Sequence, residues 1–536
     1  MQKNSVNYDV LSPVNFLIRS AEVYPEKVGV VYNDMRYTYF EFYQRVNRLA
    51  DALKKNGINK NDKVAFLCPN IPPLLEAHYA VPMIGAALVC INIRLSANEA
   101  AYIINHSDAK AVFVDNEFAG IITPVLGQLE KVEFFVNICD IADERPLPGS
   151  GFESFLATGS PEPLPIDVEN ESDTATINYT SGTTGLPKGV MYHHRGAYLN
   201  ALGEILEARL DFNSVYLWTL PMFHCNGWCF TWAVTAVGAT HVCLRAVVLD
   251  EVFRLIETEN ISHMCAAPTV LVMMSNYAGA GNLKMRRKLE IVTAGAPPAP
   301  KVIENVEAMG ANITHVYGLT EVFGPHSVCA WKPEWNALPS RQMAELKSRQ
   351  GVAYITTHYM DVVDPATLRP VPRDGQTVGE IVMRGNNVMS GYYKDPEATQ
   401  VAFDGGWFHS GDLAVIHPDN YVQIVDRKKD IIISGGENIS TVEIENVIFQ
   451  HPDVMEVAVI PIPDDKWGEV PKAFVVPKEG THPTAESIIN FCKQNLARFK
   501  APKVVEFSPL PKTATGKIQK FKLREKEWQG RERKVN

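Results

Sequence analysis

The segment that decides the fold reads YTSGTTGLPKG and spans residues 179–189. It continues an apolar run, residues 176–179, which predicts a buried strand that ends in a loop of glycines and hydroxyls. Glycines let backbone N–H groups turn toward an anion without Cβ clashes. The loop differs from a Walker A loop, which requires Gly-x4-Gly-Lys-Ser/Thr. Its composition alone fits a flexible surface loop as well as a phosphate-binding loop.

The chain is too long for one compact core and too ordinary in composition for wholesale disorder. It has 536 residues, of which 46% are hydrophobic and 21% charged, whereas single cores stop growing near about 250–300 residues. The net charge of −10 argues against a generic nucleic-acid binder. Residues 427–536 carry 19 basic and 15 acidic side chains, which leaves 32 and 46 for the rest. We therefore expect a large acidic body and a small basic unit.

Short apolar runs alternate with helical patterns in the first part of the chain. A capping box at Thr38 and Glu41 predicts the start of a helix. Apolar runs at residues 64–68, 111–114 and 242–244 predict buried strands. Buried strands separated by helices are typical of an α/β fold, with mostly parallel sheets and helices on their faces.

The pattern changes near residue 380 to strands joined by glycine- and aspartate-rich turns, at residues 379–385 and 421–425. A charged stretch follows, and after it come helical patterns at residues 441–450 and 485–498 and strand patterns at 456–461 and 473–477. These boundaries predict a large N-terminal domain over residues 1–425 that includes a β-barrel-like subdomain, a hinge at 426–430, and a small α+β domain at 431–536.

Seven motifs, in order along the chain, resemble those of the adenylate-forming superfamily, which includes acyl-CoA synthetases, adenylation domains of peptide synthetases and firefly luciferase. The loop at residues 179–189 is the first. The others are PMFH (221–224), GAP (295–297), YGLTE (317–321), GWFHSGD (406–412), DRKKD with SGGEN (426–430 and 434–438), and PKTATGK (511–517). The ordered set favours a phosphate loop over a plain surface loop.

The resemblance implies a two-step reaction that uses ATP, Mg²⁺ and coenzyme A. A carboxylic acid is joined to the α-phosphate of ATP with release of pyrophosphate, and a thiol then replaces AMP. The first step brings two anions together, so positive charge must be supplied where they meet. Lys517 is expected to bridge the carboxylate and the α-phosphate. Glu321 is expected to hold Mg²⁺, and Asp412 with Arg427 to bind the ribose.

The remaining nucleotide and CoA contacts are carried over from the same motifs. Tyr317 offers an aromatic face to adenine, and Lys429 is the hinge about which the small domain rotates. That rotation removes Lys517 and brings in residues 435–437, where a side chain on Gly436 would block the pantetheine arm. The other cofactor-binding residues implied are Thr180, Ser181, Gly182, Thr183, Thr184, Gly185, Lys188, Gly295, Ala296, Pro297, Gly318, Thr320, Gly435 and Glu437.

His224 is expected both in catalysis and in the acyl pocket. Peptide-synthetase domains for α-amino acids typically carry Asp near this position, so His224 argues against an amino acid. Trp228, Trp232 and Phe323 could line the pocket or simply pack in the core. The HCNGW string at residues 224–228 and residues 331–351 resemble a subgroup that includes plant acyl-activating enzymes and bacterial methylmercaptopropionate-CoA ligases. We expect a short- to medium-chain acid, with branched, thioether-bearing and aromatic acids all left open, and a place in fatty acid metabolism.

Two alternatives remain within the superfamily: acyl transfer to the phosphopantetheine of a carrier protein, and a luciferase-like oxidase. The sequence shows no apolar signal segment, no run of about 18 apolar residues and no peroxisomal C-terminal signal, so we expect a cytoplasmic protein. Nine dispersed cysteines predict reduced thiols rather than a disulfide framework. A homodimer is expected only because two-fold oligomers are common.

Overall fold

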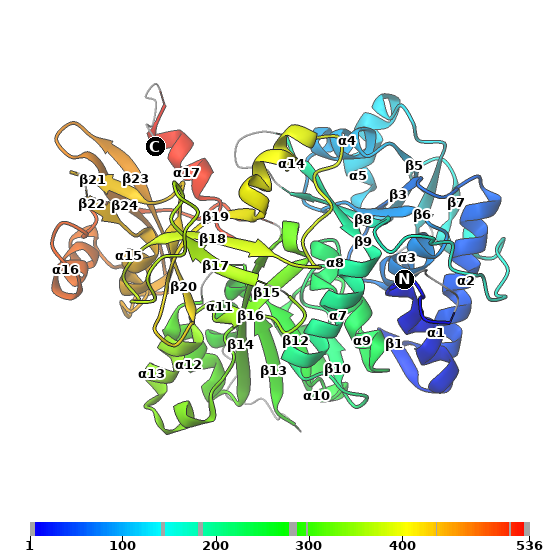
Figure 1. Ribbon diagram of the computed structural model, residues 1–536, viewed down its shortest axis with the longest axis horizontal. Helices are drawn as coiled ribbons and strands as arrows, with labels where there is room; N and C mark the ends of the chain where they lie inside the picture. Colours follow the sequence, from blue (N-terminus) through cyan, green and yellow to red (C-terminus); the bar gives the residue numbers. More distant parts are fainter. Residues whose placement is uncertain are drawn as a thin grey trace.

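The computed structural model of the chain describes residues 6–140, 145–180, 186–277, 287–295, 298–357, 359–435, 437–513 and 516–529. Figure 1 shows a large body, blue to yellow, with a smaller unit in orange and red at its left. The smaller unit, called the lid below, consists of the elements after β20 (Val422–Arg427). This arrangement confirms the predicted α/β class, with a large N-terminal part and a small C-terminal part.

A nine-stranded sheet forms the centre of the large body. Its inner neighbours pair in parallel and its ends are antiparallel. In spatial order the strands are β16 (Val352–Ala353), β15 (Gly324–Val328), β14 (Ala311–Leu319), β13 (Leu289–Thr293), β12 (His263–Ala266), β10 (Val215–Leu217), β11 (Thr240–Val242), β1 (Val28–Tyr32) and β2 (Met35–Thr38).

A seven-stranded sheet lies beside it and ends in the candidate phosphate loop. Every neighbouring pair is parallel except β8 with β9, which flank that loop. In spatial order the strands are β7 (Ser150–Gly151), β6 (Phe134–Ile138), β5 (Ala109–Asp115), β3 (Lys63–Leu67), β4 (Ala87–Cys90), β8 (Thr174–Thr180) and β9 (Lys188–His193).

Amphipathic helices cover the sheets and bury their apolar sides in a shared core. The predicted capping box is present: Thr38 Oγ1 accepts from Glu41 N at 3.2 Å and Glu41 Oε2 accepts from Thr38 N at 2.8 Å. The helices of the large body are α1 (Val14–Val23), α2 (Tyr39–Lys55), α3 (Pro72–Met83), α4 (Ala97–His106), α5 (Ala119–Ile122), α6 (Phe152–Leu156), α7 (His194–Ala208), α8 (Cys225–Trp228), α9 (Phe230–Ala236), α10 (Leu249–Thr258), α11 (Pro268–Ser275), α12 (Pro300–Ala308), α13 (Ser340–Lys347) and α14 (Pro396–Ala402).

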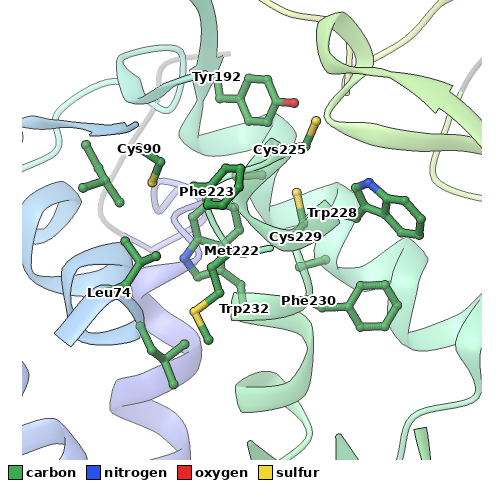
Figure 2. Close-up of a cluster of buried hydrophobic side chains, with 14 of the residues drawn as sticks. Leu74, Cys90, Tyr192, Met222, Phe223, Cys225, Trp228, Cys229, Phe230 and Trp232 are labelled. Carbon is green, nitrogen blue, oxygen red and sulfur yellow. The ribbon is translucent and has the colours of Figure 1, made fainter. Parts of the chain in front are cut away.

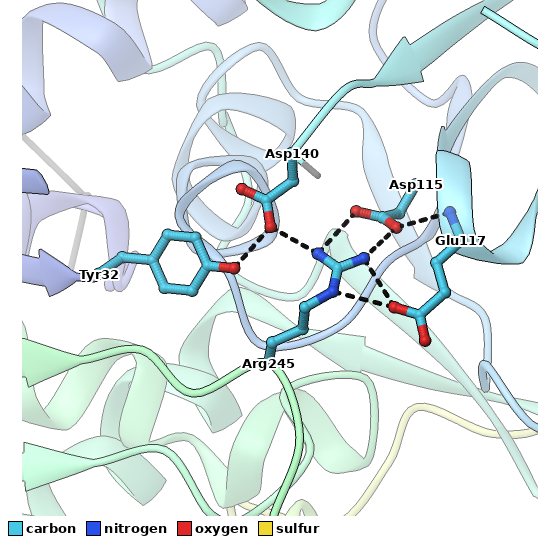
Figure 3. A network of polar contacts seen from close by, with 5 residues as sticks. All are labelled: Tyr32, Asp115, Glu117, Asp140 and Arg245. Atoms are coloured by element: carbon cyan, nitrogen blue, oxygen red, sulfur yellow. Dashed lines mark hydrogen bonds and ion pairs between the residues drawn. The ribbon is translucent and has the colours of Figure 1, made fainter. Parts of the chain in front are cut away.

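The two large sheets are joined by a polar network as well as by apolar packing. One buried cluster contains Phe66 and Phe113 of the seven-stranded sheet together with Trp218 and Tyr317 beside or within the nine-stranded sheet. Figure 3 shows the polar network, in which Arg245, after β11, meets four oxygen-bearing side chains. Its guanidinium bonds Asp115 (2.5 Å), Asp140 (2.6 Å) and Glu117 (2.9 Å), and Tyr32 of β1 donates to Asp140 at 2.5 Å.

The segment before the lid is an antiparallel sheet of β17 (Tyr359–Val363), β18 (Gly379–Arg384), β19 (Phe408–Ile416) and β20. It occupies the place of the subdomain that was predicted to be barrel-like. The lid is built on a second sheet, antiparallel except where β25 pairs with β24. Its elements are β21 (Ile432–Ser434), β22 (Glu437–Ile439), α15 (Thr441–Ile448), β23 (Val454–Asp464), β24 (Gly468–Pro477), α16 (Ala485–Asn495), β25 (Val504–Phe507) and α17 (Lys520–Glu527).

The predicted strands and helices are present, with shifted ends. The helix expected to reach residue 498 ends at Asn495, because Leu496 adopts extended backbone angles. Strand β20 runs to Arg427 and so takes in the first two residues of the expected hinge; the domain limits stay a prediction. All nine cysteines are free thiols, as expected. Within the described residues, no helix is long and apolar enough to span a membrane.

Candidate active site

Asp412 and Arg427 face each other at the edge of the four-stranded sheet. They are opposite residues of β19 and β20, and Arg427 Nε lies 3.4 Å from Asp412 Oδ1. From β14, the Tyr317 hydroxyl donates to Asp412 Oδ2 at 2.7 Å. Burial and the neighbouring carboxylate raise the pKa of Tyr317 well above its usual value, so it stays a neutral donor. Asp412 is thus held in place, while the half-exposed Arg427 remains accessible to a ligand.

Glu321 lies in the short 3-10 turn after β14, one residue from Thr320. Its Oε1 accepts from the Tyr392 hydroxyl at 2.9 Å. Lys188, at the start of β9, lies 4.8 Å from the centre of the Tyr392 ring. Burial raises the pKa of Glu321 above its ordinary value, so an added cation would stabilise the charged carboxylate. The turn thus brings Glu321, which follows the nine-stranded sheet, close to Lys188 of the seven-stranded sheet.

The donor set at Glu321 fits magnesium that is shared with substrate phosphates. Mg²⁺ prefers hard oxygen ligands and usually takes one or two carboxylates from the protein, with phosphate and water completing its shell. Glu321 supplies one such carboxylate. No cluster of three or more His, Cys, Asp or Glu suited to a metal occurs in the described parts of the chain. The site therefore fits a metal held largely by its substrate rather than an all-protein cage.

Lys517 of the lid lies at this same site. Its loop is closed by Thr513, whose N–H donates to Lys517 O at 2.7 Å and whose Oγ1 accepts from Lys517 N at 3.0 Å. Arg94 Nη1 reaches Thr513 O at 3.5 Å, and a Cβ on Gly516 would lie 2.2 Å from Thr269 Oγ1. The lysine loop is thus docked on the large domain.

The electrostatics of Lys517 confirm how near it lies to the nucleotide residues. Burial, and after it the charge of Arg427, lower the pKa of Lys517 to about 7. The carboxylates of Asp412 and Glu321 act in the opposite direction. The structure therefore brings together Lys517, Glu321, Asp412 and Arg427, which the motifs had linked only through resemblance.

His224 stands beside this lysine as a neutral imidazole. Burial, and then the charge of Lys517, lower the pKa of His224 to about 4. Its Nε2 lies 3.7 Å from the Sγ of Cys225. Because Lys517 contributes to the shift, the structure places His224 near the expected meeting point of the acid and ATP.

The aromatic residues expected in or near the acyl pocket lie in different surroundings, and Figure 2 shows two of them, Trp228 and Trp232. Trp228 is 5% exposed, and its indole covers Gly324, where a Cβ would lie 3.0 Å from the ring. Phe323 is fully buried and stacks on Tyr192 with ring centres 4.0 Å apart. Trp232 donates to the His78 carbonyl at 3.1 Å in the core. Trp228 and Phe323 lie next to the Glu321 turn, and their role in the pocket stays a prediction.

Other predicted residues lie at the ends of strands or outside the described residues. Thr180 ends β8, Gly295 follows β13 with φ of +96°, and Gly318 packs so closely on Gly324 that a Cβ would meet its carbonyl at 1.8 Å. The residues outside the described parts are Ser181, Gly182, Thr183, Thr184, Gly185, Ala296, Pro297 and Gly436.

The loop expected at the thiol step lies on the lid itself. Gly435 N–H donates to Trp467 O at 2.7 Å, and Glu437 begins β22 as an exposed residue. Lys429 follows the end of β20, and burial, with the nearby Arg427, lowers its pKa. The lid orientation seen here is thus the one that presents Lys517 to the site, while Gly435 bonds within the lid and Glu437 is exposed.

Three residues beside the site carry no motif that singled them out. Tyr392 fixes Glu321, while Arg94 and Thr269 receive the lysine loop. Their partners lie far away in the sequence, so no local pattern announces them. A tyrosine that follows a glycine, as at Gly391–Tyr392, is too common a pairing to serve as a signal.

The sequence matches two family descriptions that together cover most of the chain. Residues 17–393 match "AMP-binding enzyme" and residues 443–517 match "AMP-binding enzyme C-terminal domain". The chain is 49% identical to 4-hydroxybutyrate–CoA ligase 2 of Metallosphaera sedula, over 96% of this chain and 94% of that protein. It is 46% identical to acetate–CoA ligase CCL3 of Humulus lupulus, over 98% and 96%.

Solved structures agree with this relation. ATP-bound MatB from Rhodopseudomonas palustris is 26% identical, with a TM-score of 0.82 over 96% of this chain and 98% of that one. A complex of the anthranilate CoA ligase AuaEII with anthranoyl-AMP has a TM-score of 0.87 at 24% identity, over 98% and 99%, and is similar in fold. The chain belongs to the family of AMP-binding enzymes, the adenylate-forming superfamily indicated by its motifs.

Proposed function

We propose that this protein is an AMP-forming acid–CoA ligase, which activates a short- to medium-chain carboxylic acid as acyl-AMP and transfers the acyl group to coenzyme A. The observation that carries the proposal is the docking of Lys517 beside Asp412 and Glu321. A lysine between the predicted ribose and metal residues is suited to an anionic meeting point. The names of two full-length relatives, a 4-hydroxybutyrate–CoA ligase and an acetate–CoA ligase, support the acid and the acceptor.

In the first step the residues of this chain orient two anions and reduce the repulsion between them. Asp412 and Arg427 hold the ribose, and the ammonium of Lys517 bridges the acid carboxylate and the α-phosphate as the carboxylate oxygen attacks phosphorus and pyrophosphate leaves. Neutral His224 adds no charge next to Lys517. Magnesium, which Glu321 would hold, neutralises phosphate charge when it is bound.

In the second step the thiolate of CoA attacks the acyl carbonyl and AMP leaves. The lid orientation described above presents Lys517, so this step is assigned to a second orientation in which residues 435–437 replace it. A side chain on Gly436 would then obstruct the pantetheine arm. Gly436→Leu is expected to retain acyl-AMP formation and to abolish thioester formation; equal loss of both steps would contradict the assignment.

The proposed acids are short to medium in length and linear, branched or aromatic. Besides the two named relatives, a 2-methylpropanoate–CoA ligase of Humulus lupulus is 43% identical over 96% of this chain. A benzoate–CoA ligase of Arabidopsis thaliana is 41% identical over the same share. Because one methylene shifts discrimination by only about 1–3 kcal/mol, several acids of similar size are expected to react.

The test is acid-dependent release of pyrophosphate from ATP over a panel from acetate to benzoate, with and without CoA. Release that yields acyl-CoA only when CoA is present supports the proposal. Release without thioester formation would instead favour a carrier-protein acceptor, and light emission or oxygen uptake a luciferase-like oxidase. Removing Mg²⁺ with a chelator should stop the first step. A cytoplasmic location, a part in fatty acid metabolism and a homodimer remain part of the proposal, to be checked by fractionation, gene deletion and sedimentation.

A further inference from the structure

The segment that follows His224 has an unusual backbone. Five consecutive residues, 225–229, have φ between +50° and +64°, and only Gly227 among them is a glycine. This is one turn of left-handed helix, closed by Cys229 N–H donating to Cys225 O at 3.3 Å. Each L-residue with a side chain costs roughly 1–2 kcal/mol in this conformation, with less for Asn. Tertiary contacts must therefore hold the turn.

The turn is packed tightly against both sides of the site. Gly227 lies under the Trp218 indole, where a Cβ would be 2.4 Å from the ring. The Cys225 thiol reaches Thr320 Oγ1 at 3.5 Å, next to Glu321. The Trp228 indole lies on Gly324, as described above. The residue before the turn, the turn itself and the nucleotide motif thus form one packed unit.

Asn226 connects this unit to the strand that enters the phosphate loop. It is fully buried, and its Nδ2 donates to Thr176 Oγ1 of β8 at 2.9 Å. The backbone carbonyl of Asn226 accepts from Thr231 Oγ1 at 3.1 Å, which connects the turn to helix α9. Asn also tolerates positive φ better than other residues with side chains. Its side chain and its backbone therefore both favour the left-handed turn.

We propose that Asn226 is a positioning residue for the acid: its hydrogen bond to Thr176 fixes the left-handed turn, and the turn fixes His224 and Trp228 against the acyl group. This inference rests on the proposed function and on the expectation that His224 and Trp228 line the acyl pocket. Asn226 itself does not touch the reacting atoms. A loss of its hydrogen bond should therefore weaken the binding of the acid while leaving the Asp412 and Glu321 side of the nucleotide site intact.

The experiment separates the hydrogen bond from the backbone. Asn226→Gly keeps a residue suited to positive φ and removes the amide, whereas Asn226→Ala removes both. Thr176→Val removes the acceptor, and Thr176→Ser keeps it as the matched control. Steady-state release of pyrophosphate gives KM for the acid and for ATP in each variant, and thermal unfolding gives Tm.

The expected result is a rise of about tenfold in KM for the acid in Asn226→Gly and Thr176→Val, since a buried hydrogen bond is lost. KM for ATP should change less than twofold, Thr176→Ser should resemble the wild type, and Asn226→Ala should be several-fold worse than Asn226→Gly. An unchanged KM for the acid in Asn226→Gly, or a parallel rise in both KM values, would overturn the inference.

The controls distinguish the remaining outcomes. If Asn226→Gly does not fold, the Thr176 pair decides: Ser retains and Val removes the hydroxyl that accepts from Asn226, and Asn178→Ala controls for the bond from Asn178 Nδ2 to the same oxygen at 3.1 Å. Equal behaviour of Thr176→Val and Thr176→Ser would also overturn the inference. If Asn226 has a purely structural role, its variants should have a lower Tm and unchanged KM values for the acid and for ATP. If the wild type releases no pyrophosphate with any acid, the proposed function itself fails, not the role of Asn226.

Discussion

Two junctions hold this molecule together, and they use charge in opposite ways. Between the two large sheets, Arg245 is surrounded by acceptors: Asp115, Asp140 and Glu117 all bond its guanidinium (Figure 3). Between the large domain and the lid, the cation is Lys517, and no described side chain forms an ion pair with its ammonium group. The junction between the sheets pairs its cation within the protein, whereas the junction with the lid leaves Lys517 without an ion-pair partner among the described side chains.

The contacts around the two cations differ in the same sense. The carboxylate of Asp115 is 1% exposed and binds Arg245 through both oxygens. Among the described contacts, the loop of Lys517 meets the large domain through a bond from Arg94 to Thr513 and the close approach of Gly516 to Thr269. The first junction should therefore determine stability, and the second should determine rate.

The largest expected effect is a loss of stability at the junction between the two large sheets. Arg245→Met leaves three carboxylates without their cation, which should reduce the free energy of unfolding by about 3–5 kcal/mol. Denaturant titration measures this change. The matched control is Arg254→Met, because Arg254 is 53% exposed and pairs only with its helical neighbour Glu251. Its loss should stay within about 0.5 kcal/mol. Equal losses in the two variants would break the comparison.

The next largest effect is expected at the junction between the large domain and the lid. Lys517→Met should reduce the rate of acyl-AMP formation by about 10²–10³-fold, the scale of one lost charge-stabilising donor. Stability should hardly change, and thioester formation from supplied acyl-AMP should survive. Lys512→Met is the control, because Lys512 lies on the same loop but pairs with Glu456 inside the lid at 2.6 Å. If the two variants lose acyl-AMP formation equally, the unpaired charge of Lys517 does not explain the loss.

A smaller effect concerns docking rather than charge. Gly516→Ala places a Cβ 2.2 Å from Thr269 Oγ1, at a φ of +82°. We expect acyl-AMP formation to fall by about tenfold, since misplacement of a positioning group is costly. Gly480→Ala is the control, with a similar φ of +77° and nothing within 4 Å of the added Cβ. Thr269→Ala should partly restore the Gly516→Ala variant; if it does not, backbone strain alone explains the defect.

The smallest expected effect is a pH dependence set by Lys517. Its pKa of about 7 means that the docked ammonium loses its proton as pH rises through neutrality. In the absence of substrate the docked lid binds fewer protons than the free one, so docking is disfavoured below that pH and favoured above it. For acyl-AMP formation, kcat/KM should fall several-fold from pH 7 to pH 8.

Lys517→Arg provides the control for this pH profile. A guanidinium stays protonated throughout this range, so the fall above neutral pH should disappear even though the overall rate is lower. A wild-type profile that is flat to pH 9, or an Arg variant with the same fall, would show that another group titrates. Both profiles can be measured with the pyrophosphate assay.

Local features of the fold could be predicted because they depend on neighbouring residues. The capping box at Thr38 and the buried strands β3 and β5 follow from spacing alone. The nucleotide residues could be named because ordered motifs resemble a known family. What could not be predicted are contacts across the sequence, such as Tyr392 with Glu321 and Gly516 with Thr269. Two residues in such a contact need not share any local pattern.

The left-handed turn shows the same limit within a short segment. Asn226 and Gly227 are residue types that accept positive φ. Cys225, Trp228 and Cys229 are not, yet they adopt it as well. The packing of Trp228 on Gly324 and of Trp218 on Gly227 imposes that conformation. No propensity of the segment itself would indicate it, so the wall of the candidate pocket had to be seen in three dimensions.

Strand β20 ends at Arg427, and the expected hinge residue Lys429 is only two residues further on. If the lid turns there, the axis passes within about 7 Å of Arg427, one of the two residues proposed to bind the ribose. In a rigid rotation, atoms close to the axis move least and atoms far from it move most. The same rotation that carries Lys517 away would hardly displace Arg427. Under the proposed function, the nucleotide would stay bound through both steps, and AMP would dissociate only after the acyl group has been transferred.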